Sequence, residues 1–331
     1  MTTTTDDPMS ADLIATARGE AAHELGPALA KLSVVVPAYN EASGIESALT
    51  ALRTACPTVE IIVVDDGATD RTRSLAETVE GVRVLSHRRN RGYGAALKTG
   101  IRNATRPFVA WYDADGQHTP EDLVRVAAPV IADAHDVVIG VRGADSAQQR
   151  DRAPGKAVLG LVARLVSGER IPDLNSGLRC FRRSILLRYL HLLPDGFSAS
   201  TTSTLMVLKR GYRVGYVPIV TQPRVGASTV KIFSDGVRTL QLIVRIVVLF
   251  EAFRVFTVLG IAFVVPGVIY GVARAVTEGR GIPILAGTAI IAGILTFFMG
   301  ILADQIVELR KERFEDLDES SAPDDDGNDN D

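Results

Sequence analysis

The chain has 331 residues, a formal net charge of −3 and a sequence pI of about 6.0. This length accommodates one large domain or two ordinary ones, and the charge excludes a nucleic-acid footprint over the whole chain. Cys56 and Cys180 are too few and too distant in sequence for a disulfide framework or a zinc site, so we expect both to be reduced and structural.

Residues 1–30 lack the basic stretch followed by an apolar stretch that marks a secretory signal peptide. We expect this segment to be disordered or weakly structured. Apolar runs that predict strands then alternate with helical periodicities, at residues 32–36, 59–64, 82–85, 108–111 and 136–140. We also expect Asn40 to cap the helix that follows the first strand. This alternation predicts an α/β domain with a mostly parallel sheet flanked by helices.

Acidic residues follow several of these strands. Asp113 and Asp115, with Gln117, follow the strand at 108–111, and Asp65 and Asp66 follow the strand at 59–64. The carboxyl ends of parallel strands form the ligand-binding edge of such sheets. Carboxylate and amide oxygens suit Mg²⁺ or Mn²⁺, which would hold a diphosphate. Each acidic group alone is also common in turns.

Arginines and glycines open the helix after the third strand, in the sequence HRRNRGYG at 87–94. Free amides and the helix dipole make this entrance a candidate anion site. His87, His118, His135 and His191 show no metal-ligand spacing, and we treat His118 as a loop or capping residue. Residues 155–168 are too short to span a bilayer and fit a core helix or a helix at the membrane surface equally well.

The C-terminal third is markedly apolar. Residues 255–273 and 282–303 carry no charge and are long enough to span a bilayer as a hairpin. Before them, apolar residues cover most of a predicted helix at 232–250 with one polar stripe, which suits an amphipathic helix at the headgroups or a buried helix with one polar seam. The cations flanking the hairpin outnumber those of its linker, so both termini should face the cytoplasm. The acidic tail should be disordered. The expected divisions are 1–30, 31–231 (catalytic), 232–252 (interfacial), 253–306 (hairpin) and 307–331 (tail).

Six motifs in order carry a resemblance to a known family: VVVPAYNE (34–41), VVDDGATD (63–70), NRGYGAAL (90–97), DADGQHTPED (113–122), DLNSGLRCF (173–181) and RVGASTVK (224–231). Together they resemble the polyprenyl-phosphate (dolichol-phosphate mannose synthase-like) branch of the family 2 glycosyltransferases. The resemblance covers about residues 32–231 and the hairpin. It implies a GT-A fold, an inverting reaction and a Mg²⁺ or Mn²⁺ cofactor.

The resemblance also implies roles for individual residues. The metal would be held by Asp113, Asp115 and Gln117, and the residues closest to the reaction would be Asp113, Asp115, Asp173 and Arg142. Asp173 would orient the acceptor or act as a base. The acceptor phosphate would be bound by Arg142, Arg179 and Ser176. The donor would be bound by Pro37, Tyr39, Glu41, Asp65, Asp66, Asn90, Gly92, Asp113, Ala114, Arg224, Ser228 and Lys231.

The expected function is transfer of a hexose from a UDP-glucose or GDP-mannose type donor to polyprenyl or dolichyl phosphate in the cell membrane. A processive polysaccharide synthase is disfavoured because its QxxRW motif is absent, Trp111 being the only tryptophan. A different membrane acceptor and a catalytically silent membrane partner remain as alternatives. Many relatives carry Glu where this chain has Thr202 and Tyr216, so the acceptor surroundings are expected to differ. The sequence leaves homo-oligomerisation open.

Overall fold

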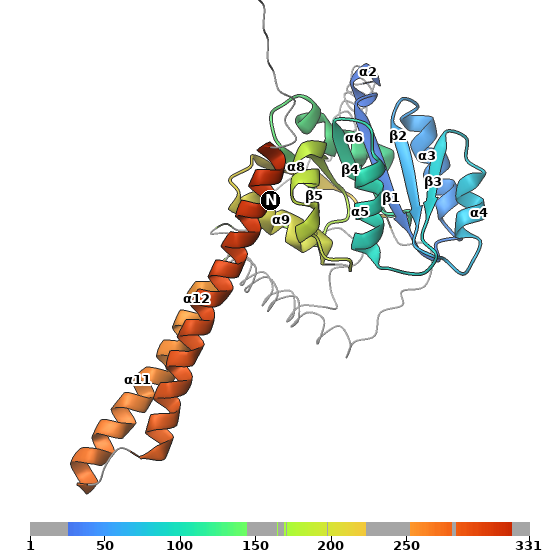
Figure 1. The fold of residues 1–331 in the computed structure, drawn as a ribbon. Coiled ribbons are helices and arrows are strands. Elements are labelled where there is room, and N and C mark those ends of the chain that lie inside the picture. Colours follow the sequence, from blue (N-terminus) through green and yellow to red (C-terminus); the bar gives the residue numbers. More distant parts are fainter. Residues whose placement is uncertain are drawn as a thin grey trace, which may run out of the picture. The chain divides into compact units, whose positions relative to one another are not determined.

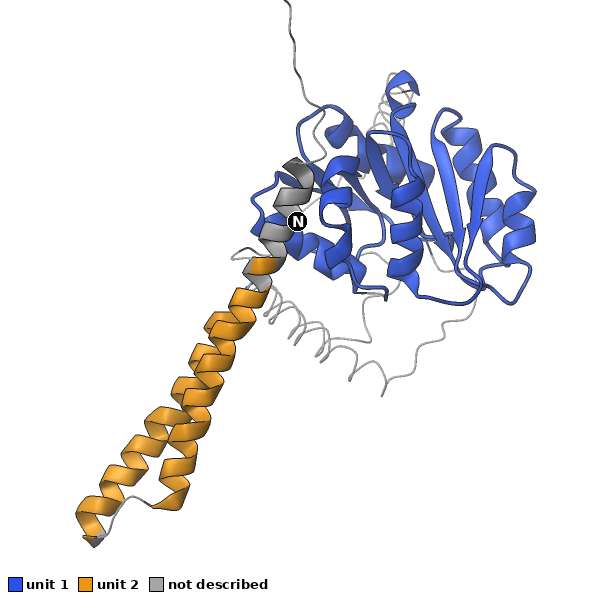
Figure 2. Cartoon of the chain, viewed as in Figure 1, with its two compact units in different colours: residues 1–231 blue, residues 232–331 orange. Residues whose placement is uncertain are grey.

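The computed structural model describes residues 26–143, 164, 169, 171–196, 198–222, 252–279 and 283–319. The expected donor residues Arg224, Ser228 and Lys231 lie outside these ranges, as do nearly all of segments 155–168 and 232–252 and most of the N-terminal segment and the tail. The chain divides into two compact units, residues 1–231 and 232–331 (Figure 2).

The first unit is built on a seven-stranded sheet with the strand order β3-β2-β1-β4-β6-β5-β7. The strands are β1 (Leu32–Ala38), β2 (Glu60–Asp65), β3 (Val82–Ser86), β4 (Phe108–Trp111), β5 (Val137–Arg142), β6 (Arg179–Arg182) and β7 (Val214–Ile219). All neighbouring pairs are parallel except those of β6, which runs antiparallel to both β4 and β5. The expected mostly parallel α/β sheet is confirmed.

Helices flank the sheet on both sides (Figure 1). They are α2 (Gly26–Leu29), α3 (Ile45–Ala55), α4 (Thr72–Glu77), α5 (Tyr93–Asn103), α6 (Pro120–Ile131), α8 (Arg183–Arg188), the 3-10 turn η1 (Leu190–Leu192) and α9 (Ala199–Lys209). Along β1, Val34 and Val36 join the core cluster that includes residues of α3 and α6, whereas Val35 meets Gly100 of α5. Burying each such aliphatic side chain contributes about 1.5–3 kcal/mol.

Three local expectations differ from the structure. Asn40 does not cap α3: its backbone is left-handed (φ 56°), its side chain accepts from the Thr69 amide, and Gly44 precedes the helix. Strand β6 was not among the expected strands, because four residues with an arginine at each end show no clear apolar pattern. The end of the N-terminal segment is ordered, because α2 buries Leu29.

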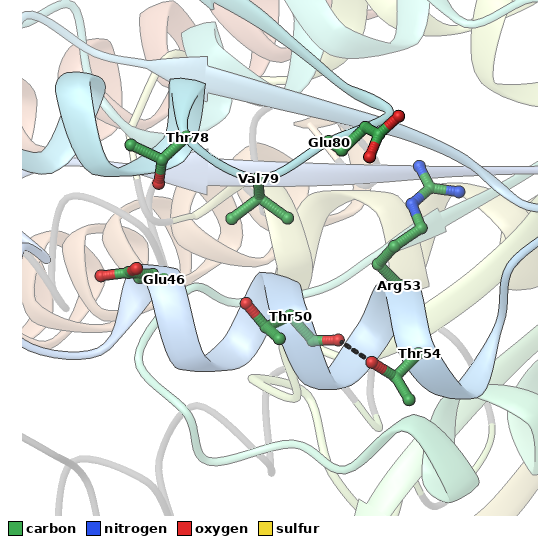
Figure 3. A pocket seen from close by; sticks show the side chains of 7 residues that line it. All are labelled: Glu46, Thr50, Arg53, Thr54, Thr78, Val79 and Glu80. Atoms are coloured by element: carbon green, nitrogen blue, oxygen red, sulfur yellow. Dashed lines mark hydrogen bonds between the residues drawn. The ribbon is translucent and has the colours of Figure 1, made fainter.

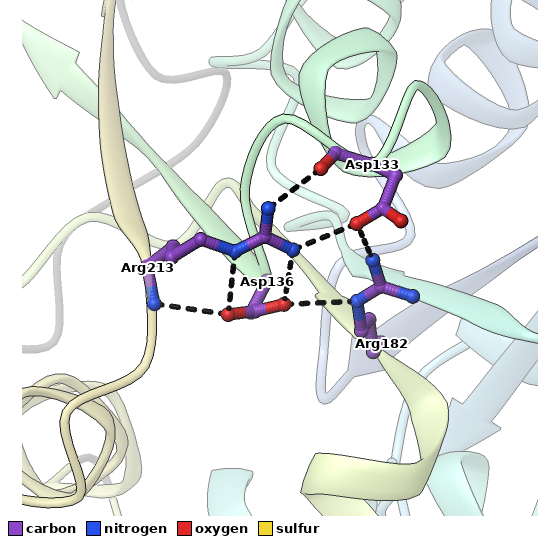
Figure 4. A network of polar contacts seen from close by, with 4 residues as sticks. All are labelled: Asp133, Asp136, Arg182 and Arg213. Carbon is purple, nitrogen blue, oxygen red and sulfur yellow. Dashed lines mark hydrogen bonds and ion pairs between the residues drawn. The ribbon is translucent and has the colours of Figure 1, made fainter.

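Ion pairs stabilise the end of the sheet opposite the predicted site, where β5 and β7 begin. Figure 4 shows Asp133 and Asp136 between the guanidinium groups of Arg182 and Arg213. Asp136 lies before β5, Arg182 ends β6 and Arg213 lies before β7. The four side chains therefore join the three strands that form this end of the sheet.

The second unit is a pair of helices, α11 (Ala252–Glu278) and α12 (Ile284–Glu319). Residues Ala252–Thr277 and Ile284–Ile306 are long and apolar enough to cross a membrane, and few of their side chains are buried, unlike those of a soluble core helix. The helices approach closely where Gly260 meets Gly293: a Cβ on Gly260 would lie 2.9 Å from the Gly293 carbonyl oxygen. The predicted apolar hairpin is confirmed.

Candidate active site

Most predicted site residues that the structure describes lie at one edge of the sheet. Strands β1, β2, β4 and β5 end there, and the reversed strand β6 begins there. The loop before β6, residues 173–178, therefore reaches the same edge as Asp113 and Arg142. This is the edge at which open α/β sheets bind ligands.

Asp113 is held by contacts from three segments. The Tyr93 hydroxyl at the start of α5 donates to Asp113 Oδ1 at 2.9 Å, and His118 Nε2 lies 3.7 Å from Oδ2. On the other side, a Cβ added to Gly177 would fall 1.9 Å from Oδ2, so only glycine leaves room for this carboxylate. Its side chain keeps 28% of its surface exposed, which leaves it open to a ligand.

These contacts keep Asp113 ionised. Burial alone would raise the pKa of Asp113, but the neighbouring His118 and the hydrogen bond from Tyr93 outweigh it and hold the pKa below the usual value. Burial and the adjacent Asp113 charge raise the pKa of Tyr93 well above its usual value, so this phenol remains a donor. The result is an anionic oxygen with a fixed position at neutral pH.

Asp115 and Gln117 lie on the same short loop as Asp113. Asp115 Oδ1 accepts from the Gln117 amide at 3.1 Å, and the Gln117 carbonyl accepts from the Gln222 amide at 2.9 Å. Among the described residues, no three His, Cys, Asp or Glu side chains are grouped to hold a metal ion. Two carboxylates and an amide oxygen fit Mg²⁺ or Mn²⁺, because such ions bind through one or two carboxylates and take their other ligands from water and substrate phosphate.

Arg142 and Asp173 are paired with each other. Arg142 Nε lies 2.7 Å from Asp173 Oδ2, and Nη2 lies 2.9 Å from Oδ1. Burial would raise the pKa of Asp173, but the Arg142 hydrogen bonds hold it below its usual value. This argues against Asp173 as a general base and favours its expected orienting role.

Arg179 and Ser176 point into the protein, which argues against their expected contact with the acceptor phosphate. Arg179 is completely buried, and Nη1 donates to the Ser200 carbonyl at 2.6 Å. Ser176 is 1% exposed, and its hydroxyl donates to the Leu178 carbonyl. Of the three residues expected at the acceptor phosphate, Arg142 is the one with a partly exposed side chain.

The expected donor residues fall into two groups. Tyr39 is 43% exposed after β1, and Asn90 is exposed in the loop after β3. Asp66, in contrast, is 3% exposed and accepts from the Arg91 and Gly92 amides at 3.0 and 2.7 Å. Asp66 thus anchors the loop that carries Asn90, which argues against its own contact with a nucleoside.

The remaining expected donor residues differ in exposure. Pro37, within β1, and Asp65 and Ala114 are buried, whereas Glu41 and Gly92 are partly exposed. The Glu41 amide donates to Thr72 Oγ1 at 2.8 Å. Gly92 has φ +103°, and a Cβ there would lie 2.5 Å from the Asp195 carbonyl oxygen. Because the Ala95 amide also donates to that carbonyl, the expected anion site at the start of α5 is partly covered.

Comparison with known protein families identifies the family of this chain. The model for glycosyl transferase family 2 matches residues 33–190, and that for the GtrB C-terminal hairpin matches residues 253–309. The polyprenol monophosphomannose synthase of Mycolicibacterium smegmatis is 32% identical over 59% of this chain and 79% of its own length. The chain belongs to glycosyl transferase family 2. The Haloferax volcanii dolichyl-phosphate hexose transferase is 31% identical over 65% of this chain and 93% of its own length.

Solved structures show the same fold as this family 2 enzyme. The glucosyl-3-phosphoglycerate synthase of Mycobacterium tuberculosis, solved with Mn²⁺, uridine diphosphate and phosphoglyceric acid, aligns with a TM-score of 0.57. The match has 22% identity and covers 68% of this chain and 81% of that chain. The expected GT-A fold is confirmed, and the chain is a glycosyltransferase.

Sequence reasoning missed several residues that support the candidate active site. His87 Nδ1 donates to Asp66 at 2.6 Å, and its Nε2 faces the Thr99 hydroxyl at 2.9 Å, so this histidine braces the donor-side loop. Tyr93 and Gly177 were quoted within motifs without a role. The run of hydroxyl residues at 200–204 in α9 was a usable signal, since five buried polar residues on one helix require polar partners.

A hollow of about 320 Å³ lies away from the predicted site, between α3 and the turn that follows α4 (Figure 3). It is lined by Glu46, Thr50, Arg53, Thr54, Thr78, Val79 and Glu80. None of the predicted site residues faces it. Arg53, which donates to the Pro57 and Val59 carbonyls, closes one end and ties α3 to the strand that follows. We assign the hollow no part in sugar transfer.

Proposed function

We propose that this family 2 enzyme transfers a hexose from a UDP-glucose or GDP-mannose type donor to polyprenyl or dolichyl phosphate, with inversion at the sugar carbon. The observation that carries the proposal is the shared edge of the sheet: the partly exposed carboxylate of Asp113 and the partly exposed guanidinium of Arg142 both lie there. Two relatives named for polyprenol or dolichyl-phosphate transfer support the choice of acceptor.

The donor side of the proposal rests on Asp113, Asp115 and Gln117. These residues would hold Mg²⁺ or Mn²⁺ at the donor diphosphate, as the Mn²⁺ and uridine diphosphate in the structural neighbour support. When bound, the ion offsets charge on the departing nucleoside diphosphate, which is worth several kcal/mol. Tyr39 and Asn90 are exposed at the same edge and are the residues we assign to the nucleoside.

The acceptor side rests on Arg142. A lipid phosphate is already an anion at neutral pH, so its oxygen can attack without a general base. The repulsion between this anion and the donor diphosphate must be reduced, and a planar guanidinium can bind two phosphate oxygens at once. Asp173 orients Arg142 by pairing with its Nε and Nη2, and among the described residues no group bonds to Nη1, which we assign to the phosphate.

The hairpin supports a lipid acceptor in particular. A polyprenyl chain stays in the bilayer, so the enzyme must work at the membrane surface, and α11 and α12 supply two candidate spans. Arg254, Arg310, Lys311 and Arg313 flank the hairpin, while Arg274 and Arg280 lie at its far turn. By the positive-inside rule, both termini and the catalytic unit face the cytoplasm.

The test uses the full chain reconstituted in liposomes with polyprenyl phosphate and a panel of radiolabelled UDP- and GDP-sugars. We expect one donor to label the lipid extract, and we expect EDTA to abolish labelling and Mn²⁺ or Mg²⁺ to restore it. Liposomes without polyprenyl phosphate are the control. If label appears on another membrane lipid, or on no lipid with any donor, the proposed acceptor is wrong.

A further inference from the structure

The buried Arg179 has an unusual set of partners. Its side chain is completely buried, yet among the described residues no carboxylate lies within ion-pair distance. A buried cation is costly unless its hydrogen bonds are satisfied. Arg179 instead donates to neutral oxygens, at 2.6–3.4 Å: the carbonyls of Leu174, Ser176 and Ser200 and the hydroxyls of Ser203 and Thr204.

These partners belong to two segments that the sheet does not join. Nε and Nη2 bind the Ser176 and Leu174 carbonyls in the loop before β6, and Nη1 binds the first turns of α9. Thr201 of α9 also donates to Asn175 of the loop at 2.9 Å. Arg179 therefore fixes the loop and α9 relative to each other.

Both segments constrain the carboxylate of Asp113, the loop by direct contact and α9 through Tyr93. From the loop, the Gly177 backbone lies directly against Asp113 Oδ2. From α9, Ala199 packs against the start of α5 beside Tyr93, since a Cβ on Gly94 would lie 3.1 Å from the Ala199 Cβ, and the Tyr93 hydroxyl donates to Asp113 Oδ1 at 2.9 Å. The loop also carries Asp173, the partner of Arg142.

The guanidinium contributes charge as well as geometry. Burial lowers the pKa of Arg179 to about 10, and the nearby Tyr93, Asp173 and Asp113 oppose this, so the group stays cationic at neutral pH. Its carbon lies 5.5 Å from the Trp111 ring centroid on the adjacent strand, a cation–π distance. A fixed positive charge therefore lies near Asp113 and Asp173.

We propose that Arg179 is a positioning residue, which acts through the loop 173–178 and through α9 and Tyr93 to fix Asp113 for divalent cation binding. The inference rests on the proposed function only for the identity of the metal-binding carboxylate. It assigns Arg179 a role in the donor half of the site, away from the lipid phosphate. Outer-shell residues of this kind typically change metal affinity about 10- to 100-fold when altered.

The experiment measures Mn²⁺ binding without turnover, by electron paramagnetic resonance on the full chain in detergent with UDP or GDP present. We expect Arg179→Lys, which keeps the charge but loses the planar fork, to weaken Mn²⁺ binding roughly ten-fold. Arg182→Lys is the matched control on the same strand, and its Mn²⁺ affinity should equal that of the parent. A folded Arg179→Lys with parental affinity would overturn the proposal.

A second variant covers the case in which Arg179→Lys does not fold. Tyr93→Phe keeps the guanidinium and removes the hydroxyl that donates to Asp113 Oδ1. We expect weaker Mn²⁺ binding here too, with an unchanged KM for polyprenyl phosphate. A Mn²⁺ affinity equal to that of the parent would contradict the proposed positioning of Asp113 through Tyr93. Reduced Mn²⁺ affinity in both variants, without transfer to polyprenyl phosphate by the parent, would sink the proposed function and leave the positioning role intact.

Discussion

Arg142 and Asp173 form a two-point ion pair in which Nε lies 2.7 Å from Oδ2 and Nη2 lies 2.9 Å from Oδ1. Asp173 also accepts from the Asn175 amide at 3.1 Å, which fixes the carboxylate within its own loop. The pair therefore presents a guanidinium of fixed orientation at the end of β5. Such planar pairs are specific in geometry, and lysine cannot reproduce them.

This pair predicts a selective defect in the acceptor reaction. Arg142→Ala should lower kcat/KM for polyprenyl phosphate roughly 10- to 100-fold, because a charge-assisted hydrogen bond contributes about 1.5–3 kcal/mol. Hydrolysis of the nucleotide sugar without acceptor should change little. Arg102→Ala, at an exposed position on α5, is the control. An equal loss of transfer and hydrolysis would move Arg142 away from the acceptor.

The aspartate pair predicts a loss of chemistry without a loss of structure. Asp115→Ala should reduce transfer by more than about 100-fold, because metal stabilisation of the leaving group is worth several kcal/mol. Membrane insertion, followed by carbonate extraction, should be unaffected. Glu121→Ala, which removes an exposed acid from the first turn of α6, should retain activity. Normal turnover by Asp115→Ala would remove this residue from the metal site.

Gly177 predicts a steric defect at the same carboxylate. Gly177→Ala places a methyl group 1.9 Å from Asp113 Oδ2, so either the loop or the carboxylate must move. We expect a loss of metal-dependent transfer of at least roughly ten-fold, by analogy with outer-shell changes. Gly196→Ala is the control, because a Cβ there meets nothing within 4 Å. If both variants retain full transfer, the contact has no part in catalysis.

The network in Figure 4 predicts an acid-dependent contribution to stability. Hydrogen bonds from Arg213, against the opposing effect of burial, lower the pKa of Asp136 from 3.8 to about 2. A carboxyl group with a depressed pKa stabilises the fold above its unfolded-state pKa, and this contribution is lost as the pH falls from about 4 to about 2. Asp136→Asn should therefore cost about 1–2 kcal/mol at pH 7 and almost nothing at pH 2.

The measurement is the thermal unfolding midpoint of the full chain in detergent between pH 2 and pH 7. Asp133→Asn is the control: Asp133 pairs with the same arginines but is largely exposed, so its midpoint should fall less. A difference between Asp136→Asn and the parent that persists unchanged at pH 2 would contradict the ionic explanation.

The sheet and the hairpin were predictable because their signals are local. Strands such as β2, with the continuous apolar run at 61–64, and the charge-free spans carry their identity in a single stretch of sequence. Strand β6 was not predictable, since four residues with an arginine at each end give no clear period. Its reversed direction depends on pairing with β4 and β5, which lie distant in sequence.

The site was predictable in its residue types but not in the direction of each side chain. The acids at 113 and 115 follow β4, and the arginine at 142 ends β5. Their positions along the chain therefore placed them at the edge of the sheet where the candidate site lies. A motif does not reveal burial, so Arg179 was assigned to a lipid phosphate although its guanidinium faces α9. Three of its partners lie more than 20 residues away in the chain, in a helix whose hydroxyl run had no assigned role.

The reversed strand β6 has a consequence for how this enzyme can diversify. Because β6 enters the sheet where β4 and β5 leave it, the loop before it lies at the same edge of the sheet as Asp113 and Arg142. Insertions or deletions in that loop would change one side of the candidate active site, while the strands β1 to β4 stayed in register. Under the proposed function, a lineage could in this way acquire a new acceptor and keep its sugar nucleotide.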